Sequence, residues 1–154
     1  VREFGPCNRS LLFNMLFNLV NNAIRYNNIG GHIFIRGSVT TSGYKIEIQD
    51  TGIGMDPSQI GNVFDRFKRF NPKDEQGYGL GLPIVKQLVE LQGGDIKLTS
   101  KLGQGSTFYF TLPFSLSEKQ MADNSISTKT FPEKKTEKAI AKNGINILLV
   151  DCLI

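Results

Sequence analysis

Two short glycine-rich stretches stand out among the residues of this chain that could bind a ligand. They are residues 50–54 (Asp-Thr-Gly-Ile-Gly) and residues 77–81 (Gly-Tyr-Gly-Leu-Gly), and the second runs straight into a predicted helix. Glycine has no Cβ, so its backbone can approach a ligand closely, and successive N–H groups in such turns form an anion-binding concavity. The first turn of a helix also favours phosphate. Together the two stretches predict a nucleotide site.

The spacing of these glycines differs from two common phosphate-binding motifs. No Gly-Lys-Ser/Thr follows either stretch, as a P-loop requires. A dinucleotide fingerprint needs two residues between its last pair of glycines, whereas one residue separates Gly79 from Gly81. Neither stretch is specific by itself, so the residues around them decide what they bind.

An asparagine-rich helix is predicted upstream of both stretches. Asn is a mediocre helix former, costing roughly half a kcal/mol per site relative to Ala, and a merely solvated face would use Glu and Lys instead. Four residues share one face through i, i+4, i+7, i+8 spacing: Asn18, Asn22, Arg25 and Tyr26. Neutral amide oxygens suit a Mg²⁺ ion that phosphates already hold. A plain polar surface is the alternative, and the glycine stretches make it the less favoured one.

Asp50 lies on the apolar face of a predicted strand. Tyr44, Ile46 and Ile48 share its parity, while the residues between them point to the other face. A carboxylate there is costly unless it finds donors, and the exocyclic amine of adenine is one such donor. The alternative is that Asp50 caps the following turn through its own side chain. The alternation alone leaves both open.

Residues 64–69 (Phe-Asp-Arg-Phe-Lys-Arg) combine two aromatic and three basic side chains. Two aromatic residues three apart are more typical of a core than of a ligand contact. The basic side chains of Arg66, Lys68 and Arg69 precede the second glycine stretch and could neutralise phosphate oxygens. His32, the single histidine, is expected to be an ordinary strand residue.

The elements that must position these residues alternate between helix and strand. Apolar periodicity and turn signals place their boundaries, with Gly93-Gly94 ending the last helix. In order we expect a helix over 10–26, strands over 32–40 and 44–50, a short helix over 56–64, a polar loop over 68–80, a helix over 82–92, and a hairpin of strands 96–100 and 107–113.

Composition changes after residue 114. Residues 115–144 are rich in Ser, Lys, Glu, Thr and Asn, and they cannot bury enough apolar surface to offset their ordering entropy, so we expect a flexible linker. Residues 145–154 (Ile-Asn-Ile-Leu-Leu-Val-Asp-Cys-Leu-Ile) resemble a buried parallel strand. Because one strand is not a domain, we expect this segment to be the first element of a truncated one.

Length and composition exclude several classes of protein. The 154 residues, 40% hydrophobic and 21% charged, are typical of one soluble globular domain and little more. No apolar run reaches the length of a membrane span, and Cys7 and Cys152 lie at opposite ends without metal-ligand partners. The net charge of +4 forms no basic stripe, which argues against nucleic-acid binding. We expect this segment to be cytoplasmic. A membrane anchor elsewhere in the parent protein is compatible with that expectation.

The order of these motifs resembles the ATP-binding catalytic (HATPase) domain of sensor histidine kinases, in the gyrase, chaperone, kinase and MutL (GHKL) ATPase superfamily. Residues 18–26 are similar to its N box, 50–55 to its G1 box and 63–69 to its F box. Residues 77–86 resemble the G2 box, and 103–108 the last hairpin of the family. The resemblance covers roughly residues 8–114, with every box in order.

The resemblance implies a role for each matching residue. Asn22, with Asn18, would hold Mg²⁺, while Arg25 would contact phosphate. Tyr26 would lie against adenine, and Asp50 would accept from its amine with Thr107 behind it. Residues 67–80 would form a lid over the nucleotide. The other residues implied to contact ATP are Gly52, Ile53, Gly54, Arg66, Phe67, Arg69, Gly77, Tyr78, Gly79, Leu80, Gly81 and Leu82.

The resemblance also implies a fold and a function. The fold would be a two-layer α/β sandwich of the Bergerat type, with a mixed sheet and three helices on one face. The function would be two-component signal transduction, in which this kinase module uses ATP and Mg²⁺ to phosphorylate a histidine on a separate dimerisation domain. ATP-hydrolysing relatives have a Glu where this chain has Asn18, so a hydrolase of the same superfamily is one alternative. A catalytically degenerate nucleotide-binding scaffold is the other.

The last ten residues carry a second resemblance. Residues 147–151 (Ile-Leu-Leu-Val-Asp) are similar to the first strand of a response-regulator receiver domain, although Cys152 replaces the second acid that usually follows. A hybrid kinase would carry both modules in one chain. The protein partners implied are a histidine phosphotransfer domain, which holds the acceptor histidine absent from this chain, and a receiver domain.

Overall fold

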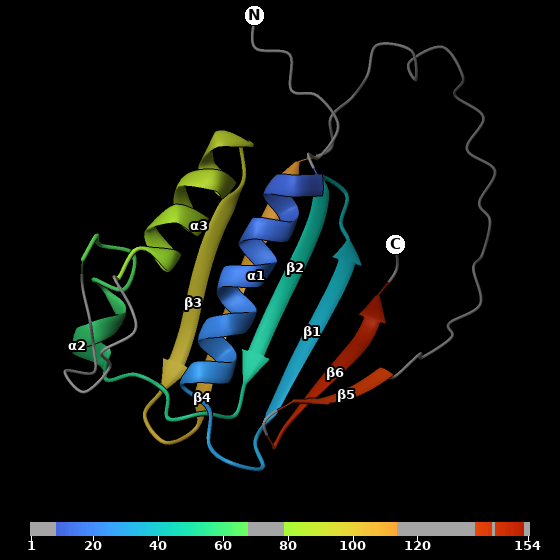
Figure 1. The fold of residues 1–154 in the computed structure, drawn as a ribbon. Helices are drawn as coiled ribbons and strands as arrows, with labels where there is room; N and C mark the ends of the chain where they lie inside the picture. Colours follow the sequence, from blue (N-terminus) through green and yellow to red (C-terminus); the bar gives the residue numbers. More distant parts are fainter. Residues whose placement is uncertain (1–8, 68–78, 114–137, 143, 153–154) are drawn as a thin grey trace, which may run out of the picture.

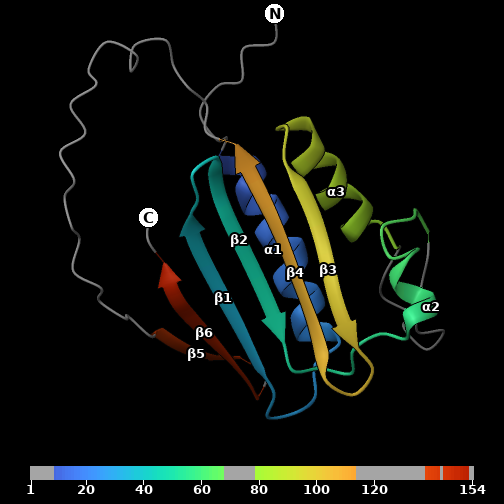
Figure 2. The same cartoon turned by 180° about the vertical axis from the view of Figure 1, so that it is seen from behind.

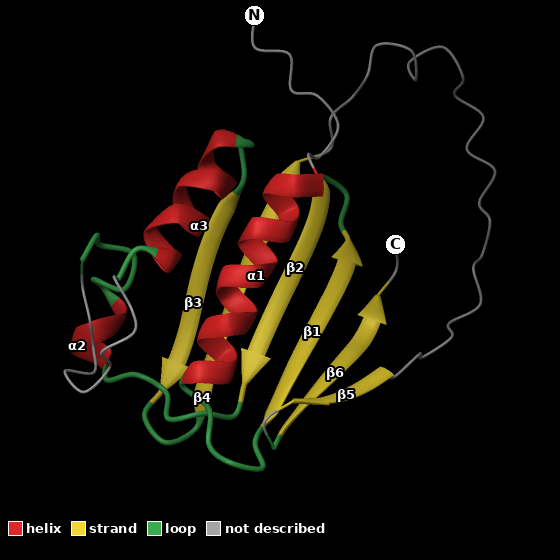
Figure 3. Ribbon diagram, viewed as in Figure 1, coloured by secondary structure: helices red, strands yellow, loops and turns green. Residues whose placement is uncertain are grey.

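A computed structural model describes residues 9–67, 79–113, 138–142 and 144–152 as helices packed on a six-stranded sheet (Figure 1). In chain order the elements are α1 (Arg9–Arg25), β1 (His32–Val39), β2 (Gly43–Asp50), α2 (Pro57–Ile60), α3 (Gly81–Leu91), β3 (Asp95–Lys101), β4 (Gly105–Pro113), β5 (Lys138–Lys142) and β6 (Ile145–Cys152). The predicted α/β class and the order of elements through residue 113 are confirmed (Figure 3). No helix in these ranges is both long and apolar enough to cross a bilayer.

The sheet is mixed, with the strand order β3-β4-β2-β1-β6-β5. Antiparallel pairing of β2 with β4 joins the hairpins β1–β2 and β3–β4, while β6 runs parallel to β1. The long helices α1 and α3 lie side by side on one face, and Figure 2 shows the other face without a helix in the described part of the chain. One buried face and one solvated face explain why polar and apolar residues alternate along the strands.

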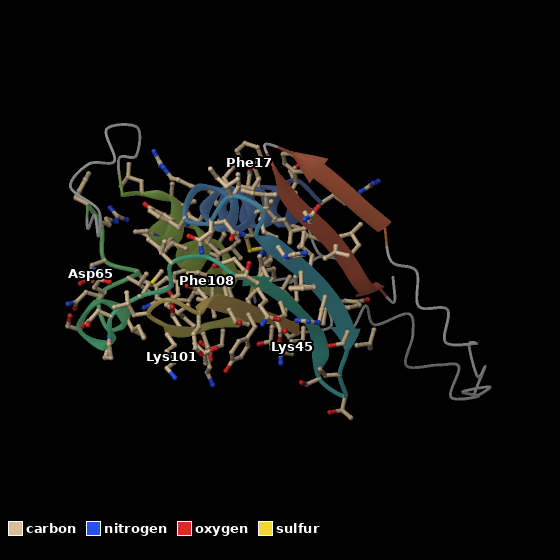
Figure 4. All side chains as sticks on the ribbon, turned by 90° about the horizontal axis from the view of Figure 1, so that it is seen from below. Phe17, Lys45, Asp65, Lys101 and Phe108 are labelled. Carbon is tan, nitrogen blue, oxygen red and sulfur yellow. The ribbon has the colours of Figure 1, made fainter. Side chains whose placement is uncertain are left out.

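The core lies between the two helices and the sheet. Met15 and Leu19 of α1 and Val85 and Val89 of α3 are fully buried, because i, i+4 spacing puts each pair on one helix face. They pack against inward side chains of the sheet, which include Ile33, Ile48, Phe108, Phe110 and Leu112. Figure 4 shows Phe108 between the two layers and Lys45 on the outer side of the sheet. The central strands β2 and β4 are therefore held on their inner face by a continuous apolar layer.

The short helix α2 is a single turn, shorter than the predicted 56–64. Oδ1 of Asp56 accepts the N–H of Ser58 at 2.9 Å, and the Gln59 side chain accepts the N–H of Asp56 at 3.0 Å, which makes a capping box. The helix ends before Gly61, and residues 61–67 form turns. Glycine is a poor helix former, so the helix that the capping box at Asp56 initiates does not extend past Gly61.

The C-terminal segment, predicted as a linker over 115–144 followed by a receiver-like strand over 145–154, contributes two described strands to the same sheet. Strand β5 occupies part of the expected linker, and β6 pairs with β1, where Ile147 lies opposite Ile33. Ile145 is buried, and Ile147 packs against the core. The physical reason is that an apolar strand loses water and gains hydrogen-bond partners along the edge of β1. Residues 114–137 lie outside the described residues.

Candidate functional site

Loops at one end of the sheet bring several predicted site residues together (Figure 1). The segment after β2, the C-terminal end of α1 and the turn between β3 and β4 all lie at this end. The N–H of Ile53 donates to the carbonyl of Tyr26 at 3.0 Å, and the N–H of Gly103 donates to the carbonyl of Ile53 at 2.7 Å. These bonds fasten the first glycine stretch between α1 and the β3–β4 turn.

Asp50, the last residue of β2, is a buried carboxylate at this end of the sheet, with only 6% of its surface exposed. Its Oδ1 accepts the N–H of Gly52 at 2.8 Å and the N–H of Ser106 at 3.3 Å. Burial raises the pKa of Asp50, and these two N–H bonds offset the rise only in part. Oδ1 therefore caps the turn that follows, as one of the two interpretations of the sequence predicts, and the contact with adenine stays a prediction.

The second carboxylate oxygen of Asp50 is available to a ligand. No described residue donates to Oδ2. Every fully buried polar side-chain atom in the described part of the chain has a hydrogen-bond partner, so Oδ2 must retain access to solvent. A carboxylate oxygen in an apolar surrounding gains from a donor that replaces water. An N–H group of a ligand fits that requirement.

Ser106, and not Thr107, is the β4 residue beside Asp50. The strand register pairs Thr107 with Gln49 and Phe108 with Ile48, so alternation puts the Thr107 side chain on the opposite face of the sheet from Asp50. The expectation that Thr107 lies behind Asp50 is corrected accordingly. Ser106 lies two residues before the buried Phe108, so both side chains are on the same face of the sheet. This spacing is the signal in the sequence that points to Ser106 as the neighbour of Asp50.

Two glycines at this end occupy places where the backbone leaves no room for a side chain. A Cβ on Gly52 would lie 2.1 Å from the carbonyl oxygen of Tyr26, and one on Gly105 would lie 2.0 Å from that of Asp50. Gly105 also has a φ of +94°, which disfavours any other residue. These glycines let three chain segments touch through their backbones, which is a packing role beyond the predicted close approach to a ligand.

The asparagine face of α1 meets the start of α3. A Cβ on Gly81 would lie 3.1 Å from Oδ1 of Asn18. Nδ2 of Asn18 donates to the carbonyl of Asn14 at 2.8 Å, which commits that nitrogen to its own helix and turns the oxygen toward α3. Asn22 lies one turn further along the same face and is half-buried. Amide oxygens beside a helix N-terminus are a donor set that fits a Mg²⁺-bound phosphate.

The structure describes the flanks of the predicted lid. The N–H of Phe67 donates to the carbonyl of Gly79 at 3.1 Å, which ties together the two sides of the gap over 68–78. Phe67 has a φ of +63° and is 72% exposed, an unusual backbone for a bulky residue. Arg66 is exposed nearby. Three predicted contacts, Arg69, Gly77 and Tyr78, lie outside the described residues.

The remaining predicted contacts occupy varied environments. Arg25 is exposed in the last turn of α1, where a cation also complements the helix dipole. Ile53 is 45% exposed beside the Asp50 turn, and Gly54 has a φ of +65°. Leu80 directly precedes α3, whereas Leu82 packs against the core. Leu82 is thus better explained as a packing residue than as a ligand contact.

Comparison with known proteins finds one family that matches most of the chain. Residues 7–116 match the family described as "Histidine kinase-, DNA gyrase B-, and HSP90-like ATPase". Over 101 residues, 64% of this chain, it is 41% identical to the adaptive-response sensory kinase SasA of Synechococcus elongatus. Over 102 residues it is also 41% identical to the sensor protein SrrB of Staphylococcus aureus. The chain spans 26% and 18%, respectively, of the lengths of these two curated relatives.

Solved structures share the fold. The mycobacterial sensor histidine kinase MprB superposes with a TM-score of 0.62 at 30% identity, covering 69% of this chain and 74% of that one. Full-length ShkA in complex with AMPPNP gives a TM-score of 0.61 at 30% identity, covering 70% of this chain and 22% of that one. The catalytic domain of the histidine kinase ThkA gives 0.60 at 25% identity, covering 69% of each chain.

Proposed function

This chain belongs to the family of histidine kinase-, DNA gyrase B- and HSP90-like ATPases, and from that premise we propose that it binds Mg²⁺-ATP and presents the γ-phosphoryl group to a histidine on a separate dimerisation domain. It is homologous to the catalytic domains of sensor histidine kinases. The observation that carries the proposal is the buried Asp50 carboxylate, one oxygen of which is held by two backbone N–H groups while the other remains accessible.

Asp50 selects the base in this proposal. Oδ2 accepts the exocyclic amine of adenine, and the fixed Oδ1 keeps the carboxylate from turning away. Tyr26 lies at the end of α1, where its carbonyl holds the turn through Ile53. A purine with an oxygen in place of the amine would put two acceptors face to face, so the site favours adenine.

The phosphates are bound between α1 and α3. The N–H groups at the start of α3 and the side chain of Arg25 supply positive potential, and Asn18 and Asn22 supply amide oxygens. These two asparagines would hold Mg²⁺, which neutralises charge on the phosphate oxygens. Phosphoryl transfer depends mainly on positioning and charge stabilisation, and those are the functions that these residues can perform.

The identity of residue 18 favours transfer over hydrolysis. A neutral amide cannot take a proton from water, so Asn18 cannot act as the general base that hydrolysis requires. The other members of the same helix face, Asn22, Arg25 and Tyr26, supply no carboxylate or imidazole for this role either. The acceptor histidine then supplies the nucleophile, and the chain supplies the bound nucleotide.

The expected partners follow from this assignment. In the parent protein a helical domain with the phosphoacceptor histidine would present its side chain at the phosphate end, and a receiver domain would take the phosphoryl group from it. ATP is a cytoplasmic substrate, so this segment would work in the cytoplasm. SasA and SrrB carry sensory names, which supports a signalling role for the parent.

Transfer of label tests the proposal directly. The 154-residue chain is incubated with ATP labelled at the γ-phosphate and Mg²⁺, alone and with a sensor-kinase dimerisation domain. We expect label on the added domain, none on the chain itself, and none when the acceptor histidine is replaced by alanine. Labelling of the chain alone would contradict the proposal. Steady release of phosphate without an acceptor would favour the hydrolase, and ATP binding without either reaction would favour the scaffold.

A further inference from the structure

A row of three polar side chains crosses the inner face of the sheet at the base end. Asp50 ends β2, Ser106 lies in β4, and Ser100 lies in β3 directly opposite Ser106. The next row inward is apolar, with Phe108 opposite both Ile48 and Leu98. A polar side chain on this face needs a partner or a purpose. Ser100 is the member of the row that touches neither Asp50 nor any atom assigned to nucleotide binding.

The hydroxyl of Ser100 joins two separate turns. Its Oγ accepts the N–H of Met55 at 2.9 Å, lies 3.0 Å from the carbonyl oxygen of Gly105 and lies 2.8 Å from Oγ of Ser106. A hydroxyl has one donor and two acceptor sites. Accepting from Met55, donating to Gly105 and accepting from Ser106 would use all three. Ser100 therefore leaves no hydrogen-bonding capacity unused.

The two turns that Ser100 joins are the two that hold Asp50. Gly52 and Met55 belong to the turn after β2, whereas Gly105 and Ser106 are the first two residues of β4 and complete the turn between β3 and β4. One N–H from each turn, that of Gly52 and that of Ser106, fixes Oδ1 of Asp50. Any change in the distance between the turns would thus rotate or displace the carboxylate.

We propose that Ser100 is a positioning residue that, by tying these two turns together, aims Oδ2 of Asp50 at the ligand and so determines the selectivity for adenine. The inference rests on the proposed function, because it assumes that Asp50 accepts the adenine amine. Ser100 acts through Asp50 and does not contact the base. Its contribution is therefore specific to ligands that donate to Asp50.

Inosine triphosphate separates this role from a merely structural one. It matches ATP except that an oxygen replaces the amine of the base, so it cannot donate to Oδ2. Calorimetry on the 154-residue chain should show tighter binding of ATP than of inosine triphosphate by at least about tenfold. In Ser100→Ala the N–H of Met55 loses its partner, and we expect ATP affinity to fall about tenfold. Affinity for inosine triphosphate should change less than about twofold.

Two variants serve as controls, and a third can replace Ser100→Ala. Ser100→Thr keeps the hydroxyl and should restore most of the ATP preference. Thr99→Ala removes a neighbouring hydroxyl on the exposed face of the same strand and should leave both affinities unchanged. If Ser100→Ala melts below the assay temperature, Ser106→Ala replaces it, since that change removes one bond to Ser100 and keeps the N–H that binds Asp50. We expect a loss of about threefold for ATP alone.

The possible outcomes distinguish failure of the positioning role of Ser100 from failure of the proposed function. Equal losses for ATP and inosine triphosphate in a folded Ser100→Ala would overturn the positioning role, and unchanged affinities would do the same. Equal binding of the two nucleotides by the unmodified chain would remove the assignment of Asp50 to the amine, and the inference with it. No binding of ATP at all would instead refute the proposed function.

Discussion

The two ends of the proposed nucleotide site are built in different ways. At the base end, a buried carboxylate is held by main-chain N–H groups from two turns, and a serine hydroxyl ties those turns together. At the phosphate end, Asn18 and Asn22 are partly exposed side chains on one helix, and Asn18 lies beside the start of another. The base end is therefore part of the sheet and its core. The phosphate end consists of side chains on the surface of the helices that cover the sheet.

This difference indicates which properties of the site are tied to folding. A change at the base end disturbs bonds that also hold β2, β4 and the adjacent turns, so recognition of the base and stability are coupled there. A change at the phosphate end alters one side chain on a helix whose core face is independent of it. Affinity for phosphate and metal can therefore vary without loss of the fold.

The largest effect is expected from Asp50→Asn. The amide keeps an oxygen for Gly52 and Ser106 but turns an N–H₂ group toward the adenine amine, so two donors meet. We expect ATP affinity to fall about 100-fold or more, because hydrogen bonds to charged groups are strong and an unpaired donor adds its own cost. Calorimetry measures the change, with Asp56→Asn, an exposed helix cap, as the matched control. Unchanged affinity in Asp50→Asn would show that the base end is not where we assign it.

A smaller and chemically different effect is expected from Asn22→Ala. Loss of one amide oxygen should weaken binding of Mg²⁺-ATP about tenfold and leave the preference for ATP over inosine triphosphate intact. When EDTA removes the metal, the difference from the unmodified chain should shrink. Asn21→Ala, on the exposed side of the same helix, is the control. A change in base preference in Asn22→Ala would contradict the separation of the two ends.

The coupling of recognition to stability at the base end can be tested with pH. Burial raises the pKa of Asp50 above its ordinary value of 3.8, so between 3.8 and the raised value the folded state binds more protons than the unfolded state. The free energy of unfolding then falls as pH rises through that window, and at neutral pH the ionised carboxylate destabilises the folded state. Asp50→Asn should melt a few degrees higher than the unmodified chain at pH 7 in the absence of nucleotide. That difference should vanish below pH 3.8, and a lower melting point at pH 7 would refute it.

The smallest effect is expected from Thr107→Ala. Its side chain lies on the outer face of the sheet, so ATP affinity should change less than about twofold. The side chain of Ser106, one residue earlier, faces the site, so Ser106→Ala should lower ATP affinity where Thr107→Ala does not. A loss of tenfold or more in Thr107→Ala would mean that the register of β4 places the wrong residue beside Asp50.

The sequence predicts much of this arrangement because several of its signals are local. Apolar spacing predicts α1 and α3, alternation predicts the inward position of Asp50, and glycines mark the turns. The contact of Ser106 with Asp50 and the bonds of Ser100 depend on how β3, β4 and β2 are paired, which no single segment encodes. The placement of β6 has the same cause. Its apolar sequence predicts a buried strand but does not specify which sheet edge covers it.

Strand β6 also has a consequence for the order in which the fold assembles. Ile33 and Ile147 pair across β1 and β6 although a long stretch of chain separates them, so closing that loop costs more entropy than closing the hairpins β1–β2 and β3–β4. The longest of the bonds around Asp50 joins residues 56 positions apart in the sequence, a shorter loop than the one that β6 closes, so the ligand site can be complete before β6 docks. Native-state hydrogen exchange should then show the amides of β6 opening before those of Gly52 and Ser106. The side of the sheet formed by β6 and β5 would be the first part of the domain to open and the last to close.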